Sequence, residues 1–210
     1  RQVSSAASDV YKRQITIGEK IPSLACMVSN SHALARYASI CQEVDIVPIV
    51  EPEVLMDGSH DIKKCFEVTN EMQSTLFEEL DKLNIINSGI ILKPNMVTPG
   101  STCEKKASAE EIAESTVMCL GNNIPKDVPG IAFLSGGQSD QDASNNLNFI
   151  NKINDNPWKL TFSYGRALQL EAMKKWQGNN NNKEEAQKIL SKRAYLNSLA
   201  ASGNYDLEME

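Results

Sequence analysis

Short apolar runs alternate with segments of helical periodicity along most of this 210-residue chain, and this alternation restricts the possible folds most strongly. The apolar runs indicate buried strands, the pattern of a parallel sheet that is covered by helices. The expected strands are Ile15–Gly18, Ile46–Val50, Ile90–Leu92, Gly130–Ser135 and Leu160–Phe162. The expected helices are residues 31–44, 62–83, 108 onward, 140–153, 166–176 and 183–200. The chain is therefore predicted to have an α/β fold.

Neither a GxGxxG run nor a Walker A motif follows any expected strand, so a nucleotide-binding doubly wound sheet lacks its usual sequence support. In a βα barrel, by contrast, the chemistry lies at the carboxyl ends of the strands. The unusual polar residues of this chain all follow such ends. We therefore expect a βα-barrel architecture with its site at that end.

Composition restricts the partners and the compartment. A formal net charge of −6, a pI near 5.1 and the absence of a basic run argue against nucleic acid or an anionic membrane as the partner, and favour a small molecule or a protein. The five cysteines are odd in number and form no CxxC or CxxH pair, which is typical of reduced thiols. No apolar run is long enough to span a bilayer, and we expect a cytoplasmic protein.

The first 14 residues differ from the rest of the chain because they show no apolar periodicity. We expect residues 1–14 to be a leader that is foreign to the domain. The domain itself is expected to span residues 15–202, and residues 203–210 to be the truncated start of a C-terminal tail.

The segment Gly89–Gly100 (GIILKPNMVTPG) carries Lys93 to the end of an apolar strand, where Pro94 stops regular pairing. An ammonium group at such a point must either pair with a carboxylate or lose its proton more easily than usual, because desolvation disfavours the charged form. Both outcomes suit an amine nucleophile. The simpler interpretation of a lone lysine at a strand end is an ion pair.

Two carboxylates, Glu51 and Glu53, follow the preceding expected strand. An extended chain places residues i and i+2 on the same side. Two carboxylates that close cannot both ionise freely, so one of them is a candidate general acid or base. The simpler interpretation is that both pair with lysines.

The last two expected strands are followed by turns that suit an anion. The turn 135–137 (SGG) leaves backbone amides open, and the turn 163–166 (SYGR) brings an arginine into the start of a helix. The simpler interpretations are a tight turn and a surface arginine. Because barrels frequently bind phosphate at their last two strands, we predict a phosphate site there.

Five motifs together resemble the class I, Schiff-base fructose-bisphosphate aldolases, from about Ile15 to Tyr205. They are LARYASICQ, IVPIVEPEVL, LKPNMVTPG, FLSGGQS and TFSYGRAL, beginning at residues 34, 46, 92, 133 and 161. The resemblance implies a (β/α)₈ TIM barrel, present here from roughly the fourth strand onward. It also implies a lyase of glycolysis and gluconeogenesis that works without a cofactor or metal and forms a homotetramer at full length.

The resemblance further implies a reaction and a role for each matching residue. The family reversibly cleaves fructose 1,6-bisphosphate to dihydroxyacetone phosphate and glyceraldehyde 3-phosphate. Lys93 would form the Schiff base, Glu51 would transfer protons during carbinolamine formation and dehydration, and Glu53 would be the supporting carboxylate. The phosphate of the dihydroxyacetone half would be bound by Ser135, Gly136, Gly165 and Arg166, with Ser163 beside them.

The chain also departs from the family. It lacks the first three strands, including an aspartate and a lysine, and Val10 stands where the fourth strand carries another lysine. The terminal tyrosine is absent as well. Because an incomplete barrel leaves unpaired parallel edges, we expect the chain alone to be poorly folded and inactive.

Three other functions compete with this one. A transaldolase or another Schiff-base aldolase shares the lysine chemistry but not this set of motifs. A metal-dependent aldolase is disfavoured because His32 and His60 are the only histidines, too few for the usual nitrogen ligands of a catalytic zinc. The third is a non-catalytic fragment that binds a phosphate ligand or the cytoskeleton.

Overall fold

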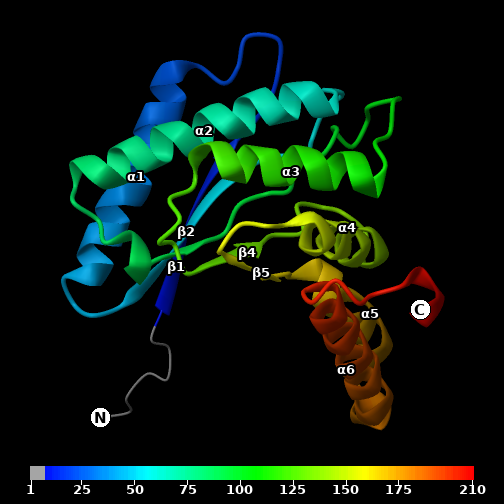
Figure 1. Ribbon diagram of the computed structural model, residues 1–210. Coiled ribbons are helices and arrows are strands. Elements are labelled where there is room, and N and C mark those ends of the chain that lie inside the picture. Colours follow the sequence, from blue (N-terminus) through cyan, green and yellow to red (C-terminus); the bar gives the residue numbers. More distant parts are fainter. Residues whose placement is uncertain (1–7) are drawn as a thin grey trace.

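The computed structural model describes residues 8–210 and contains one five-stranded parallel sheet (Figure 1). The strands lie in chain order and are β1 (Ser8–Ile15), β2 (Val47–Val54), β3 (Ile91–Leu92), β4 (Gly130–Phe133) and β5 (Lys159–Phe162). All four neighbouring pairs are parallel, which confirms the predicted α/β class. Within the described residues β1 and β5 are the two edges, so the sheet is an open part of a barrel.

A helix follows each strand, and successive helices pack side by side (Figure 1). The helices are α1 (Leu24–Gln42), α2 (Ile62–Lys82), α3 (Ala109–Asn123), α4 (Asp140–Ile153), α5 (Arg166–Trp176) and α6 (Lys183–Ala200). Short 3₁₀ helices occupy Asn87–Gly89, Asn180–Asn182 and Leu207–Met209. In the described part of the chain, no helix is both long and apolar enough to cross a membrane.

The first four helices each begin after a serine or aspartate whose side chain accepts a backbone hydrogen bond. These N-caps are Ser23, Asp61, Ser108 and Ser139. Each cap satisfies one of the free amides at the helix start and so fixes the residue at which the chain leaves the loop. At α3 the predicted capping box is complete, because the Glu111 carboxylate accepts the Ser108 amide hydrogen bond at 2.8 Å.

Apart from the first strand, two boundaries differ from the sequence expectation by more than two residues. Helix α1 begins at Leu24 rather than Ser31, and Ser31 is instead fully buried in its middle with its hydroxyl 3.8 Å from the sulfur of Met72. Strand β2 continues to Val54, so Glu51 lies within the strand and not after it. In both cases contacts with distant segments extend the element beyond its local signal.

The expectation that residues 1–14 are a leader foreign to the domain is wrong for residues 8–14. Residues 8–14 form most of β1, and β1 pairs along its whole length with β2, from Ser8 opposite Val47 to Ile15 opposite Val54. Pairing with a buried neighbour holds this polar segment in the sheet despite its lack of apolar periodicity. Residues 1–7 of the expected leader lie outside the described residues.

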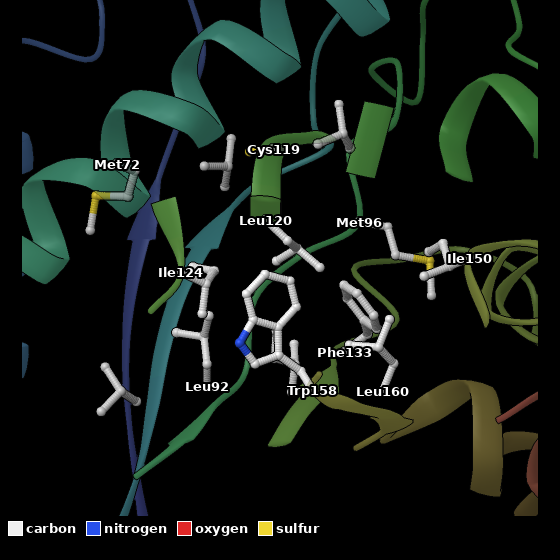
Figure 2. Close-up of a cluster of buried hydrophobic side chains, with 14 of the residues drawn as sticks. Met72, Leu92, Met96, Cys119, Leu120, Ile124, Phe133, Ile150, Trp158 and Leu160 are labelled. Carbon is white, nitrogen blue, oxygen red and sulfur yellow. The ribbon is translucent and has the colours of Figure 1, made fainter. Parts of the chain in front are cut away.

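The core lies between the sheet and the helices. Trp158 lies among side chains of β3, β4, β5 and α3, and its indole N–H donates to the carbonyl of Pro125 at 2.8 Å (Figure 2). Phe133 and Leu92 are fully buried beside it. Because each such side chain contributes about 1.5–3 kcal/mol on burial, this cluster firmly anchors the middle strands. The site residues can therefore project from a rigid base.

Candidate active site

One cavity of about 780 Å³ lies at the carboxyl ends of the strands. All eight residues expected at the site line it: Glu51, Glu53, Lys93, Ser135, Gly136, Ser163, Gly165 and Arg166. They come from four neighbouring strands and the loops that follow them. The cavity thus brings together residues that are more than one hundred positions apart in the sequence.

Lys93 and Glu51 form an ion pair in this cavity. The Lys93 Nζ lies 3.3 Å from Glu51 Oε2, and the two side chains are 16% and 6% exposed. The backbone N–H of Lys93 donates to the carbonyl of Val50 at 2.8 Å, so pairing with β2 extends one residue beyond β3. Of the two outcomes predicted for this lysine, the structure shows pairing with a carboxylate. This separation lies just beyond ordinary hydrogen-bond reach, and such contacts commonly shorten when substrate binds.

Glu53 has a separate set of partners on β1. Its Oε2 accepts from Lys12 Nζ at 2.9 Å and from Gln14 Nε2 at 2.8 Å. The hydrogen bond to Glu53 raises the pKa of Lys12, so Lys12 stays a cation beside this carboxylate. The two glutamates therefore face different partners: one pairs with the candidate nucleophile, and the other ties β2 to β1.

Lys12 and Gln14 also line the cavity, and sequence reasoning missed both as site residues. Because the segment that contains them has no apolar periodicity, its sequence predicts a leader and not a strand. One signal could have identified them. Lys12 and Gln14 are two residues apart, so an extended chain places them on the same side, and the neighbouring strand carries two glutamates at the same spacing. That signal becomes visible only once the register between β1 and β2 is known.

The anion side of the cavity is built by β4, β5 and the loops after them. Gly136 and Gly137 both have positive φ angles, of 58° and 94°, which a residue without a Cβ adopts readily. Helix α5 begins at Arg166 after Gly165, and no side chain caps it. Its first amides and the guanidinium therefore favour a bound anion.

An amine in contact with a carboxylate, next to open backbone amides and a guanidinium at the carboxyl ends of parallel βα units, is an arrangement that suits imine chemistry on an anionic carbonyl compound. The chain belongs to the class I fructose-bisphosphate aldolase family, because the family's model, described as fructose-bisphosphate aldolase class-I, matches residues 9–210. The resemblance predicted from the sequence motifs is thereby confirmed. The match begins within β1, which agrees with the corrected domain boundary.

Relatives and a solved structure support the same family. A probable fructose-bisphosphate aldolase class 1 of Xanthomonas axonopodis pv. citri is 50% identical over 196 residues, which cover 93% of this chain and 59% of that protein. Fructose-bisphosphate aldolase C of Pan troglodytes is 50% identical over 193 residues, which cover 91% and 53%.

A co-crystal structure of Plasmodium falciparum fructose-bisphosphate aldolase with TRAP and a small-molecule inhibitor is similar, with a TM-score of 0.94 and 42% identity, over 95% of this chain and 58% of that one. The chain thus spans between about half and three-fifths of the length of these proteins. This partial coverage agrees with the predicted partial TIM barrel.

Proposed function

We propose that the whole protein reversibly cleaves fructose 1,6-bisphosphate to dihydroxyacetone phosphate and glyceraldehyde 3-phosphate through an imine on Lys93. The single observation that carries this proposal is the 3.3 Å pair of Lys93 and Glu51 in the cavity that also contains Arg166. Membership of the aldolase family suggests the substrate and the residue roles, and the geometry supports those roles.

Lys93 Nζ attacks the C2 carbonyl carbon of the ketose as a neutral amine, so its proton must first move to a base. Glu51 accepts that proton and returns it to the hydroxyl that leaves as water when the carbinolamine becomes a protonated imine. The protonated imine then withdraws the electron pair of the C3–C4 bond. As that bond breaks, the C4 hydroxyl passes its proton to the Glu51 carboxylate, which the loss of water has left ionised, and becomes the aldehyde of glyceraldehyde 3-phosphate.

The enamine that remains on Lys93 takes that proton back from Glu51 at C3, and water then hydrolyses the resulting imine, which releases dihydroxyacetone phosphate and the free amine. Glu53 acts as the supporting carboxylate in this scheme. Its contacts with Lys12 and Gln14 fix the carboxyl end of β2 and so the neighbouring Glu51. Lys93, Glu51 and Glu53 all line the same cavity.

The phosphate of the dihydroxyacetone half is held by the turn at Ser135 and Gly136 and by the start of α5 at Gly165 and Arg166, with Ser163 beside them. Arg166 offers a planar fork of donors that matches phosphate oxygens. The uncapped N-terminus of α5 adds amides and a favourable dipole. This site fixes the carbonyl carbon of the substrate relative to the amine.

Borohydride reduction in the presence of dihydroxyacetone phosphate tests the proposal. A folded sample, verified by cooperative urea unfolding, should acquire a secondary amine that mass mapping locates at Lys93. The variant Lys93→Arg should acquire none. Labelling at another lysine, or no labelling in a folded sample, would overturn the proposed function. Binding of the phosphate ligand without imine trapping would instead support the non-catalytic alternative.

For the 210-residue chain by itself we expect no measurable turnover, because the described sheet has two unpaired parallel edges where a closed barrel has none. Trapping at Lys93 needs only the amine, the carboxylate and the phosphate site. The assay monitors cleavage of fructose 1,6-bisphosphate by the purified chain through coupled reduction of the triose products. Measurable cleavage would contradict this expectation.

We further propose that the whole protein is a cytoplasmic homotetramer, as the family resemblance implies. The five cysteines are free thiols, four of them buried, which supports a reducing compartment. Light scattering on the full-length protein tests the tetramer, and a monomer at micromolar concentration would overturn it.

A further inference from the structure

Two prolines interrupt the backbone pairing beside the Lys93 and Glu51 pair. The bond from the Lys93 N–H to the Val50 carbonyl joins the two strands at 2.8 Å. Beyond it, Pro52 has no N–H to donate toward β3, and Pro94, whose carbonyl faces β4, has none to donate toward β4. Val50 O and Val54 N both face the β3 side, so alternation along the strand places residue 52 toward β3 as well. Regular pairing is thus lost beside Lys93.

The side chain of Asn95 replaces the missing backbone pairing. Its Oδ1 accepts from the Val54 N–H at 2.9 Å, which reconnects the two strands one step beyond Pro52. Its Nδ2 donates to the Met96 carbonyl at 3.1 Å and to Thr69 Oγ1 of α2 at 3.2 Å. Asn95 is 5% exposed and Thr69 2% exposed, so these bonds are shielded from water. The carboxamide is therefore held in three directions.

The backbone between Lys93 and Asn95 is also fixed, on the side that faces β4. The carbonyl of Pro94 accepts from the Leu134 N–H at 3.1 Å, which ties the segment to the end of β4. Lys93 and the next two residues are thus bonded in turn to β2, to β4 and to β2 again. Removal of the Asn95 carboxamide would release one of these ties and leave the buried Val54 N–H without its acceptor.

We propose that Asn95 is a positioning residue that sets the separation of Lys93 from Glu51, an inference that rests on the proposed imine chemistry of Lys93. Asn95 bonds only to protein groups in these contacts and acts through the backbone of the LKPN segment. The position needs both an acceptor and a donor. An aspartate would keep the acceptor for Val54 but would lose the N–H groups that reach Met96 and Thr69.

The test compares Asn95→Ala with Asn148→Ala, a matched control. Asn148 is 1% exposed and also makes two buried hydrogen bonds, to the backbone of Tyr205, but it lies on α4 away from the cavity. The rate of borohydride trapping at Lys93 is measured over a range of dihydroxyacetone phosphate concentrations. Since misplacement by about 1 Å can cost about 10²-fold in rate, Asn95→Ala should lower the maximal rate by about 10- to 100-fold.

The half-saturating concentration should stay within about twofold of the wild type, because the phosphate site lies on β4 and β5. Asn148→Ala should change neither quantity. Thr69→Val removes one of the three bonds of Asn95 and should lower the maximal rate by only a few fold. If Asn95→Ala does not unfold cooperatively in urea, and so is not properly folded, Thr69→Val is used in its place.

A second readout needs no substrate. Reductive methylation of Lys93 at low reagent concentration should be several-fold faster in Asn95→Ala than in the wild type, because the amine separates from Glu51. If the wild type is trapped at Lys93, and Asn95→Ala shows the same trapping and methylation rates as the wild type, this inference is overturned and the proposed function is left intact. Failure of the wild type to trap, with faster methylation in Asn95→Ala, would overturn the proposed function and support the positioning role.

Discussion

Gly100 packs directly against the backbone of Gly58, and this contact joins the loops that follow β2 and β3. A Cβ atom at position 100 would lie 2.2 Å from the Gly58 carbonyl oxygen, which is shorter than any real contact of such an atom. The Gly100 N–H donates to the His60 carbonyl at 2.8 Å, and the Thr102 N–H donates to the Gly58 carbonyl at 3.0 Å. The loop after Lys93 is thus bonded to the loop after the two glutamates.

Gly100→Ala should separate these two loops and destabilise the protein. The backbone of Gly58 cannot move aside as a flexible side chain could, so we expect a loss of about 1–3 kcal/mol in the free energy of unfolding, the usual range for overpacking. Urea unfolding monitored by circular dichroism measures it. Gly121→Ala is the matched control, because a Cβ at this α3 position meets nothing within 4 Å.

The control should raise the free energy of unfolding by up to about 1 kcal/mol, since alanine favours a helix interior over glycine. A Gly100→Ala protein as stable as the wild type would show that the loops are free to separate.

Glu51→Gln should slow imine formation without unfolding the protein. Glutamine keeps the size of the side chain but cannot take the proton of Lys93, and a positioned acid or base contributes about 10²–10⁴-fold. We therefore expect trapping by borohydride to slow by about 10²-fold or more.

The matched control for this variant is Glu79→Gln. Glu79 is a buried glutamate of α2 that contacts Lys82 and His32, outside the cavity. Its replacement should leave the trapping rate within about twofold. Equal slowing by both variants would remove Glu51 from the proposed chemistry and indicate a general loss of structure.

Much of the fold is predictable because its signals are local. Helices α4, α5 and α6 have the bounds that periodicity predicts, and the capping box places the start of α3. Strand β1 is different. Its polar residues become favourable only opposite β2, where Glu53 accepts from Lys12 and Gln14, and a pairing between segments 39 residues apart leaves no local trace.

The sequence predicts which residues belong to the candidate site but not how they are arranged in it. A lysine followed by a proline at the end of an apolar run is locally unusual, and so are two glutamates around another proline. The lysine and both glutamates line the cavity. Which glutamate faces Lys93 depends on the register of three strands. The role of Asn95 likewise depends on Val54 and Thr69, which are 41 and 26 residues away.

The cysteines should differ sharply in reactivity. Burial raises the pKa of the Cys119 thiol to about 12 and also raises that of Cys65, so at pH 8 neither forms an appreciable amount of the nucleophilic thiolate. Cys26 is exposed on α1. Iodoacetamide at pH 8 should therefore alkylate Cys26 first, and Cys65 and Cys119 only after urea unfolding. Mass mapping of a time course measures this, and native labelling of Cys119 at the rate of Cys26 would contradict it.

His60 should make stability depend on pH in the mildly acidic range. Within the described residues, both of its ring nitrogens are buried and have no hydrogen-bond partner. Desolvation lowers the pKa of His60 below its usual 6.5, although the nearby Asp61 opposes this. The folded protein therefore keeps His60 neutral at pH values where the unfolded chain already binds a proton.

Because the unfolded state then binds more protons, the free energy of unfolding should fall as the pH drops below 6.5, until the lower folded pKa of His60 is passed. His60→Phe removes this titration and should flatten the dependence between pH 7 and 5. His32→Gln, which alters the only other histidine, should retain the fall that is due to His60. Urea titrations at four pH values measure it, and a wild-type slope that survives in His60→Phe would assign the dependence to other groups.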